Sequence, residues 1–319
     1  MRRCIAVLLG LLLLAPTTAS AQQLPLPIRI EGNGITVRAE SGMSRLANRI
    51  AKMAPKKLRS ISADLEHLAK PPKVEIRLIK RSANMTRASP PGHRVPGWAA
   101  GVAFPRLGVI VVATRREHNT INVPNTVAHE LAHLAMGAAL RGRAPRWLDE
   151  GFAYLHSSEY SFARWRTLVG MAWTGNVIPW RELDDSFPAQ EQEAGRAYAQ
   201  SYDLVSFLAI RGKHKHTDDD GDRWPFQQFL SLIASGHTPD EAARVAYLNS
   251  MDQLHSEWYQ QLRKRYLLLP AELIALGIWV VGAILLIIAY IRRRRINRGR
   301  LQQWAEEENA IPDAPPQNV

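Results

Sequence analysis

The chain has 319 residues, of which 46% are apolar, so it is long enough to bury a core in one or two domains. Its formal charge is +12, but the basic residues are scattered and no nucleic-acid recognition module is visible. We therefore expect a solvated basic surface and no nucleic-acid partner. The only cysteine is Cys4, which excludes a disulfide scaffold and a thiolate metal site.

Residues 1–21 have the pattern of a secretory signal peptide. Two arginines precede an apolar run from Ile5 to Ala15, and the small residues at 19–21 match a cleavage site. The apolar run is too short to cross a bilayer as an uncleaved anchor. We expect this segment to be removed and residues 22–266 to form an extracytoplasmic domain.

A second apolar run, from Leu273 to Ile291, contains no charged residue and predicts a transmembrane helix over residues 271–291. Four consecutive arginines follow at 292–295, and such positive flanks stay in the cytoplasm. Residues 292–319 are polar and predict a disordered cytoplasmic tail. These features indicate a single-pass protein in contact with membrane lipid, and they suit a bacterial inner membrane with a periplasmic domain.

In chain order, alternating apolar residues predict strands at 35–39 and 73–80. Between them, residues 44 to about 68 have helical spacing that Pro55 interrupts. Residues 89–98 predict a loop, residues 109–113 another strand, and helical patterns run from Pro124 to Tyr266. Strands followed by helices indicate an α+β fold, with a strand-containing part at 22–118 and a helical part at 119–266.

The pentapeptide from His129 to His133 reads H-E-L-A-H. On a helix, two histidines four residues apart lie on one face, so both imidazoles can reach a single zinc ion. Glu130 lies beside them, where its carboxylate can take a proton from a water molecule next to that ion. The spacing therefore predicts a hydrolytic metal site.

A third ligand is available 17 residues after His133, in the sequence Pro-Arg-Trp-Leu-Asp-Glu-Gly-Phe-Ala that begins at Pro145. Gly142 ends the first helix and Pro145 opens a second, which returns Glu150 toward the histidines. Two histidines, one glutamate and an open position form a common catalytic zinc site. Asp149 either orients a ligand histidine or is solvated.

These motifs resemble those of the gluzincin metallopeptidases of the peptidase MA-like group, and W-L-x-E-G-F-A is similar to the M1 aminopeptidases. The resemblance implies a zincin-like, thermolysin-type catalytic domain that binds one Zn²⁺ ion. It implies an edge strand for substrate within residues 98–113, and a helix on which Tyr198, or alternatively Tyr202, stabilises the oxyanion. The acid with which M1 aminopeptidases grip the substrate amine is absent from residues 101–105, which favours cleavage within a chain.

We therefore expect a membrane-anchored zinc endopeptidase acting on a protein or peptide substrate. The alternative is a catalytically degenerate zinc-binding domain that acts as a membrane-tethered interaction protein. Hydrolysis of a non-peptide bond by the same site is a third possibility.

Overall fold

The computed structural model describes residues 23–65, 68–71, 73–96, 99–157, 161–184, 187, 191–211 and 224–310, without the side chains of 191–193, 224, 268–276, 305 and 307–310. The chain divides into two compact units. The first comprises residues 1–161 and 178–254, and the second residues 162–177 and 255–319.

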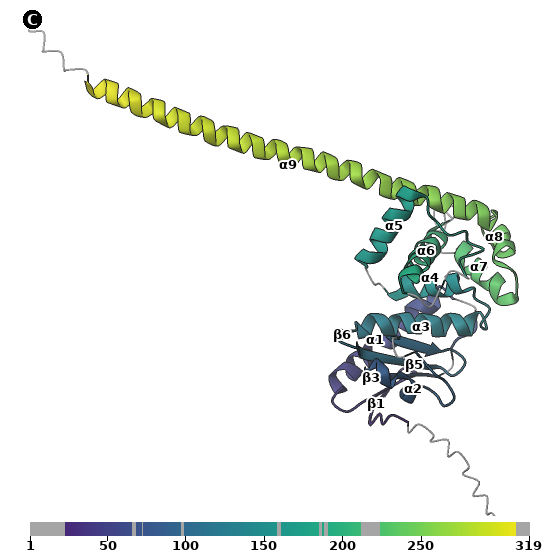
Figure 1. Cartoon of the computed structure of the whole chain (residues 1–319). Coiled ribbons are helices and arrows are strands. Elements are labelled where there is room, and N and C mark those ends of the chain that lie inside the picture. Colours follow the sequence, from purple (N-terminus) through teal and green to yellow (C-terminus); the bar gives the residue numbers. More distant parts are fainter. Residues whose placement is uncertain are drawn as a thin grey trace, which may run out of the picture. The chain divides into compact units, whose positions relative to one another are not determined.

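A mixed β-sheet forms the N-terminal part of the first unit (Figure 1). Its strands follow the spatial order β1-β2-β3-β5-β4, and β6 pairs with the end of β5. The central strands β2, β3 and β5 are parallel, while β1 and β4 are antiparallel edge strands. Their bounds are β1 Ile28–Gly32, β2 Ile35–Ala39, β3 Val74–Arg81, β4 Gly101–Phe104, β5 Val109–Arg116 and β6 Asn119–Thr120.

Helices cover both faces of this sheet. On one face, α1 (Ser44–Ala63) and α3 (Val123–Ala139) pack side by side over the buried alternate residues of β2, β3 and β5. On the other face, the short helix α2 (Met85–Ala88) follows the turn η1 (Ser82–Asn84) and covers a second apolar cluster that includes Ile79 and Val111. Because both faces of β5 are covered, this strand begins with the continuous apolar run 109–113, whereas β3 alternates apolar and charged residues over most of its length.

The remaining helices of the first unit are α4 (Arg146–Ser157), α6 (Glu191–Ile210), α7 (Trp224–Ser235) and α8 (Pro239–Ala246). Helix α4 packs between α3 and α6, so it connects the sheet-covering layer with the C-terminal helices. The second unit contains α5 (Phe162–Thr174) and the greater part of α9 (Met251–Ala310).

The predicted α+β class is confirmed, and strands occur at the predicted positions 35–39, 73–80 and 109–113. The predicted edge strand is β4, although Trp98 lies outside the described residues. The expected interruption at Pro55 is wrong, because α1 continues through this residue. Pro55 is buried together with Ile50 and Ile61, and packing of this face offsets the hydrogen bond that proline cannot donate.

The transmembrane helix predicted over residues 271–291 is not confirmed. In the described part of the chain, no helix is both long enough and apolar enough to cross a membrane. The side chains of 271–276 lie outside the described residues, and arginines begin at 292.

The two ends of the chain give a mixed outcome. Residues 292–310 continue helix α9, so the disordered tail predicted for 292–319 is wrong over this stretch. Its arginines, glutamines and glutamates have good intrinsic helix propensity, which polarity alone did not reveal. The predicted signal peptide at 1–21 and residues 311–319 lie outside the described residues.

Helices α4 and α6 approach each other closely at Gly151, which gives a test of this packing. A Cβ atom added there would lie 2.4 Å from the carbonyl oxygen of Ser201 and 2.5 Å from Cγ2 of Val205. We expect Gly151→Ala to lower the free energy of unfolding by about 1–3 kcal/mol in urea or thermal melts. The matched control is Gly170→Ala on α5, where a Cβ meets no atom within 4 Å and stability should be unchanged or higher. Equal melting of the two variants would contradict the close contact.

Candidate metal centre

Helix α3 presents the two histidines of the H-E-L-A-H motif on one face. Asn122 caps the helix by accepting a hydrogen bond from the backbone N–H of Asn125, and Pro124 occupies its first turn, as expected for a helix start. The side chains of His129 and His133 are 18% and 15% exposed. Their Nε2 atoms lie 3.1 Å apart, with the rings edge to face. Both imidazoles thus offer a nitrogen at the same point.

Helix α4 brings Glu150 to this point. Arg141 and Gly142 adopt left-handed backbone angles, φ 53° and 71°, and this turn reverses the chain between α3 and α4. The Asp184 carboxylate accepts the backbone N–H of Trp147 at 3.0 Å, which satisfies a free donor at the start of α4. As a result, Oε2 of Glu150 lies 3.7 Å from Nε2 of each histidine.

The donor set fits a zinc ion. One ligand atom from each of His129, His133 and Glu150 lies within 4.8 Å of the others, and among the described residues this is the group of three able to share a cation. Ligand atoms bound to a tetrahedral zinc ion at 2.0–2.1 Å lie about 3.3 Å from one another. The separations of 3.1 and 3.7 Å lie on either side of that value. Two imidazole nitrogens and one carboxylate oxygen are also the atoms that zinc prefers.

Asp149 faces His133 from the outer side of the cluster. Its Oδ2 atom lies 3.0 Å from Nδ1 of His133, so the carboxylate fixes the ring and leaves Nε2 directed at the other ligands. The sequence left two roles open for Asp149, orienting a ligand histidine or remaining solvated, and this contact favours the first. Burial by itself would lower the pKa of His133, but Asp149, Glu150 and Glu130 together raise it to about 10 in the metal-free protein.

Glu130 is 7% exposed and lies between α3 and the edge strand β4. The backbone N–H of Ala103 on β4 donates a hydrogen bond to its carboxylate. Gly101 makes room for the side chain, since a Cβ there would lie 2.7 Å from Oε1 of Glu130. Burial raises the pKa of Glu130 to about 7, against the opposing effect of His133. A carboxylate with this pKa can accept and return a proton near neutrality.

Tyr198 reaches the cluster from helix α6. Its ring packs edge-on against Tyr154 at 5.8 Å, and Tyr154 packs in turn against His129 at 4.6 Å. Burial and the Glu150 carboxylate raise the pKa of the Tyr198 phenol, while a hydrogen bond from Arg146 opposes this. Because a guanidinium can only donate, the Tyr198 oxygen accepts from Arg146 and its own proton remains available to another acceptor.

Arg146 and Tyr154 were not singled out from the sequence. The Arg146 guanidinium donates to the backbone carbonyl of Phe187 and lies 4.6 Å from the centre of its ring. Both residues are four positions from Glu150, one before it and one after it, on helix α4. That spacing places all three on the same helix face, so it was the signal that could have identified them.

Comparison with known families agrees with this geometry. The family model of the peptidase MA superfamily matches residues 73–264, more than half of the chain. The chain belongs to the peptidase MA superfamily. The matched region contains β3, β4 and every residue of the candidate metal centre. The predicted relationship to this superfamily of metallopeptidases is therefore confirmed. No curated protein matches the chain.

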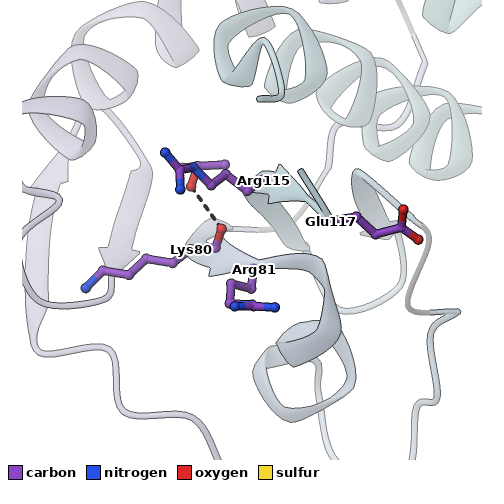
Figure 2. Close-up of a pocket in the computed structure, with 5 residues that line it drawn as sticks. Lys80, Arg81, Arg115 and Glu117 are labelled. Carbon is purple, nitrogen blue, oxygen red and sulfur yellow. Dashed lines mark hydrogen bonds between the residues drawn. The ribbon is translucent and has the colours of Figure 1, made fainter. Parts of the chain in front are cut away.

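A cavity of about 320 Å³ lies elsewhere in this peptidase MA domain, at the ends of β3 and β5 (Figure 2). It contains none of the candidate metal ligands. Figure 2 shows Lys80 and Glu117 pointing in opposite directions, and the dashed line marks the Thr114 hydroxyl donating to the Lys80 carbonyl at 3.0 Å. Its side chains do not converge on one point, so the metal-ligand cluster stays the candidate functional site.

The raised pKa of His133 predicts how metal affinity depends on pH. Zinc binding must displace the His133 proton, so apparent affinity should rise about tenfold per pH unit between pH 7 and 9. Without bound metal, protonated His133 stabilises the fold fully below pH 6.5, and this contribution disappears as the pH rises through about 10.

Competition with a chelator of known affinity measures the slope of apparent zinc affinity against pH. Asp149→Asn should flatten it, whereas Asp184→Asn should leave it unchanged, and an unaltered slope in Asp149→Asn would contradict the assignment.

Proposed function

We propose that this protein is a zinc-dependent metallopeptidase that hydrolyses peptide bonds within protein or peptide chains. The observation that carries the proposal is the convergence of His129, His133 and Glu150 on one point, with the Glu130 carboxylate buried beside it. Membership of the peptidase MA superfamily supports the reaction class.

Zinc bound by these three residues would polarise the scissile carbonyl and lower the pKa of a water molecule. Glu130 would accept a proton from a water molecule beside these ligands and would return it to the departing amine. Its position supports this role, because Ala103 holds the carboxylate from the side of β4 and the two histidines adjoin it on α3. Asp149 keeps the His133 ring in the orientation required for ligation.

Tyr198 donates a hydrogen bond from its hydroxyl to the substrate oxygen as negative charge develops there. Of the two tyrosines that the sequence left open, Tyr198 is favoured because its hydroxyl interacts with both Arg146 and Glu150. The hydrogen bond from Arg146 occupies the phenol oxygen and so directs the proton away from the guanidinium.

Cleavage within a chain is the proposed mode. Strand β4 is an edge strand, so an extended substrate can pair with its free side and continue past the metal centre in both directions. Residues 101–105 read Gly-Val-Ala-Phe-Pro and offer no carboxylate to hold a free amino terminus. For the location, we propose that the domain acts outside the cytoplasm, on the signal-peptide pattern of residues 1–21.

The competing reading is a zinc-binding domain that has lost catalysis and acts by interaction alone. Retention of Glu130 argues against it, because a domain that only holds zinc for structure has no need of a buried base beside the ligands. Metal binding without hydrolysis of casein or a peptide library would favour that reading.

The decisive variant for the proposed reaction is Glu130→Gln. It removes the base but keeps the size of the side chain, so we expect unchanged zinc stoichiometry and a loss of kcat of about 100-fold or more on casein. Metal content by mass spectrometry and turnover should be measured on the same preparation. Full activity in Glu130→Gln would remove this residue from the mechanism.

Tyr198→Phe tests the second catalytic role. Deleting one hydroxyl that binds only the developing oxyanion should lower kcat by about 10–1,000-fold with little change in KM. Tyr202→Phe, on the same helix, is the matched control and should retain kcat. If Tyr202→Phe were the impaired variant, the assignment of the two tyrosines would have to be exchanged.

A further inference from the structure

Three arginines form a row across the sheet face that α1 and α3 do not cover. Arg38 on β2 is the register partner of Arg29 on β1 and of Arg77 on β3. Register partners point to the same face, so three like charges stand side by side on neighbouring strands. Like charges in such positions repel each other unless a negative group lies between them.

The two outer arginines have counter-charges in the structure, but the middle one does not. Arg29 is exposed and pairs with Glu31. Arg77 is only 12% exposed, contacts Glu75 at 2.6 Å and donates to the carbonyl of Ala88 at 2.7 Å. Within the described residues Arg38 forms no ion pair, and its Nε atom is buried without a hydrogen-bond partner. The Glu75 carboxylate is thus engaged by Arg77, and Arg38 beside it has no carboxylate partner of its own.

A cavity of about 240 Å³ opens beside this uncompensated charge. Arg38 and Arg77 line it from the sheet, Ala88 lines it from α2, and residues 23–26 line it from the N-terminal side. Residues 23–26 are fixed there, since Leu24 donates a backbone hydrogen bond to the carbonyl of Arg87 and Leu26 is buried in the apolar cluster under α2. The cavity therefore has walls that backbone and apolar contacts hold in place, and two arginines are among its lining residues.

We propose that this cavity is a binding site for a small oxyanion such as phosphate or sulfate. Planar guanidinium groups offer paired N–H donors that match oxyanion geometry, and the buried Nε–H of the partly buried Arg38 has no acceptor in the structure. The excess of arginine over carboxylate excludes a cation. An anion bound here connects β2, β3 and the segment 23–26, so it stabilises the N-terminal side of the sheet. The site shares no residue with the metal centre and is independent of the proposed catalysis.

The test is thermal unfolding of the full chain with sodium phosphate, compared with sodium chloride at the same ionic strength. We expect phosphate to raise the midpoint of unmodified protein by a few degrees, because a ligand that binds only the folded state stabilises it. Arg38→Gln should abolish this rise. Arg29→Gln is the matched control, since Arg29 belongs to the same row but does not line the cavity, and it should keep the rise.

Two further measurements separate binding from a structural role of Arg38. Without phosphate, Arg38→Gln should melt at the same temperature as the unmodified protein or higher, because it removes an unpaired charge. Calorimetric titration of the unmodified protein with inorganic phosphate, and separately with sulfate, should show saturable binding. Absence of saturable binding, an equal phosphate effect in Arg38→Gln, or a chloride effect as large as that of phosphate would each overturn the proposal.

Discussion

The contact between α3 and α4 is the constraint on which the candidate site depends. It gathers His133, Asp149, Glu150 and Glu130 in a space where little solvent reaches the side chains. Burial raises the pKa values of Glu130 and Glu150, and repulsion among the three carboxylates raises them further. A divalent cation relieves the repulsion directly, so the charge distribution that is unfavourable in the empty fold becomes favourable when metal binds.

Residues without side chains make this crowding possible. Gly151 follows the candidate ligand Glu150 and lets α4 approach α6, the helix that carries Tyr198. Gly101 on β4 leaves the space that the Glu130 carboxylate occupies. Each glycine therefore sets the distance between two elements that contribute opposite sides of one site, and a methyl group at either position would separate them.

The proximity of the three candidate ligands could be predicted from the sequence because their positions follow from short-range geometry. Histidines four residues apart share a helix face, and one turn returns Glu150 to them. The role of Tyr198 was predicted only from the family resemblance, because no local sequence spacing connects this residue with Glu150. The row of arginines was invisible for a different reason: β1 was not predicted, and the register of β2 against β3 arises from pairing between segments distant in sequence. In helix α9 a prediction failed for a local reason. The polarity of residues 292–310 suggested disorder, but their intrinsic helix propensity favours the helix that the structure shows.

The edge strand connects substrate binding with the chemistry. Ala103 lies on β4, where a substrate in extended form would pair, and the same residue donates its N–H to Glu130. The strand that would hold the scissile bond therefore also holds Glu130, the proposed base, which projects from the helix that carries both histidines. Four residue pairs with β5 set the register of β4. A displacement of β4 would move the proposed base relative to the candidate metal ligands, so the geometry of the proposed reaction depends on this register. This coupling explains why the β-sheet is needed in a site whose ligands all come from helices.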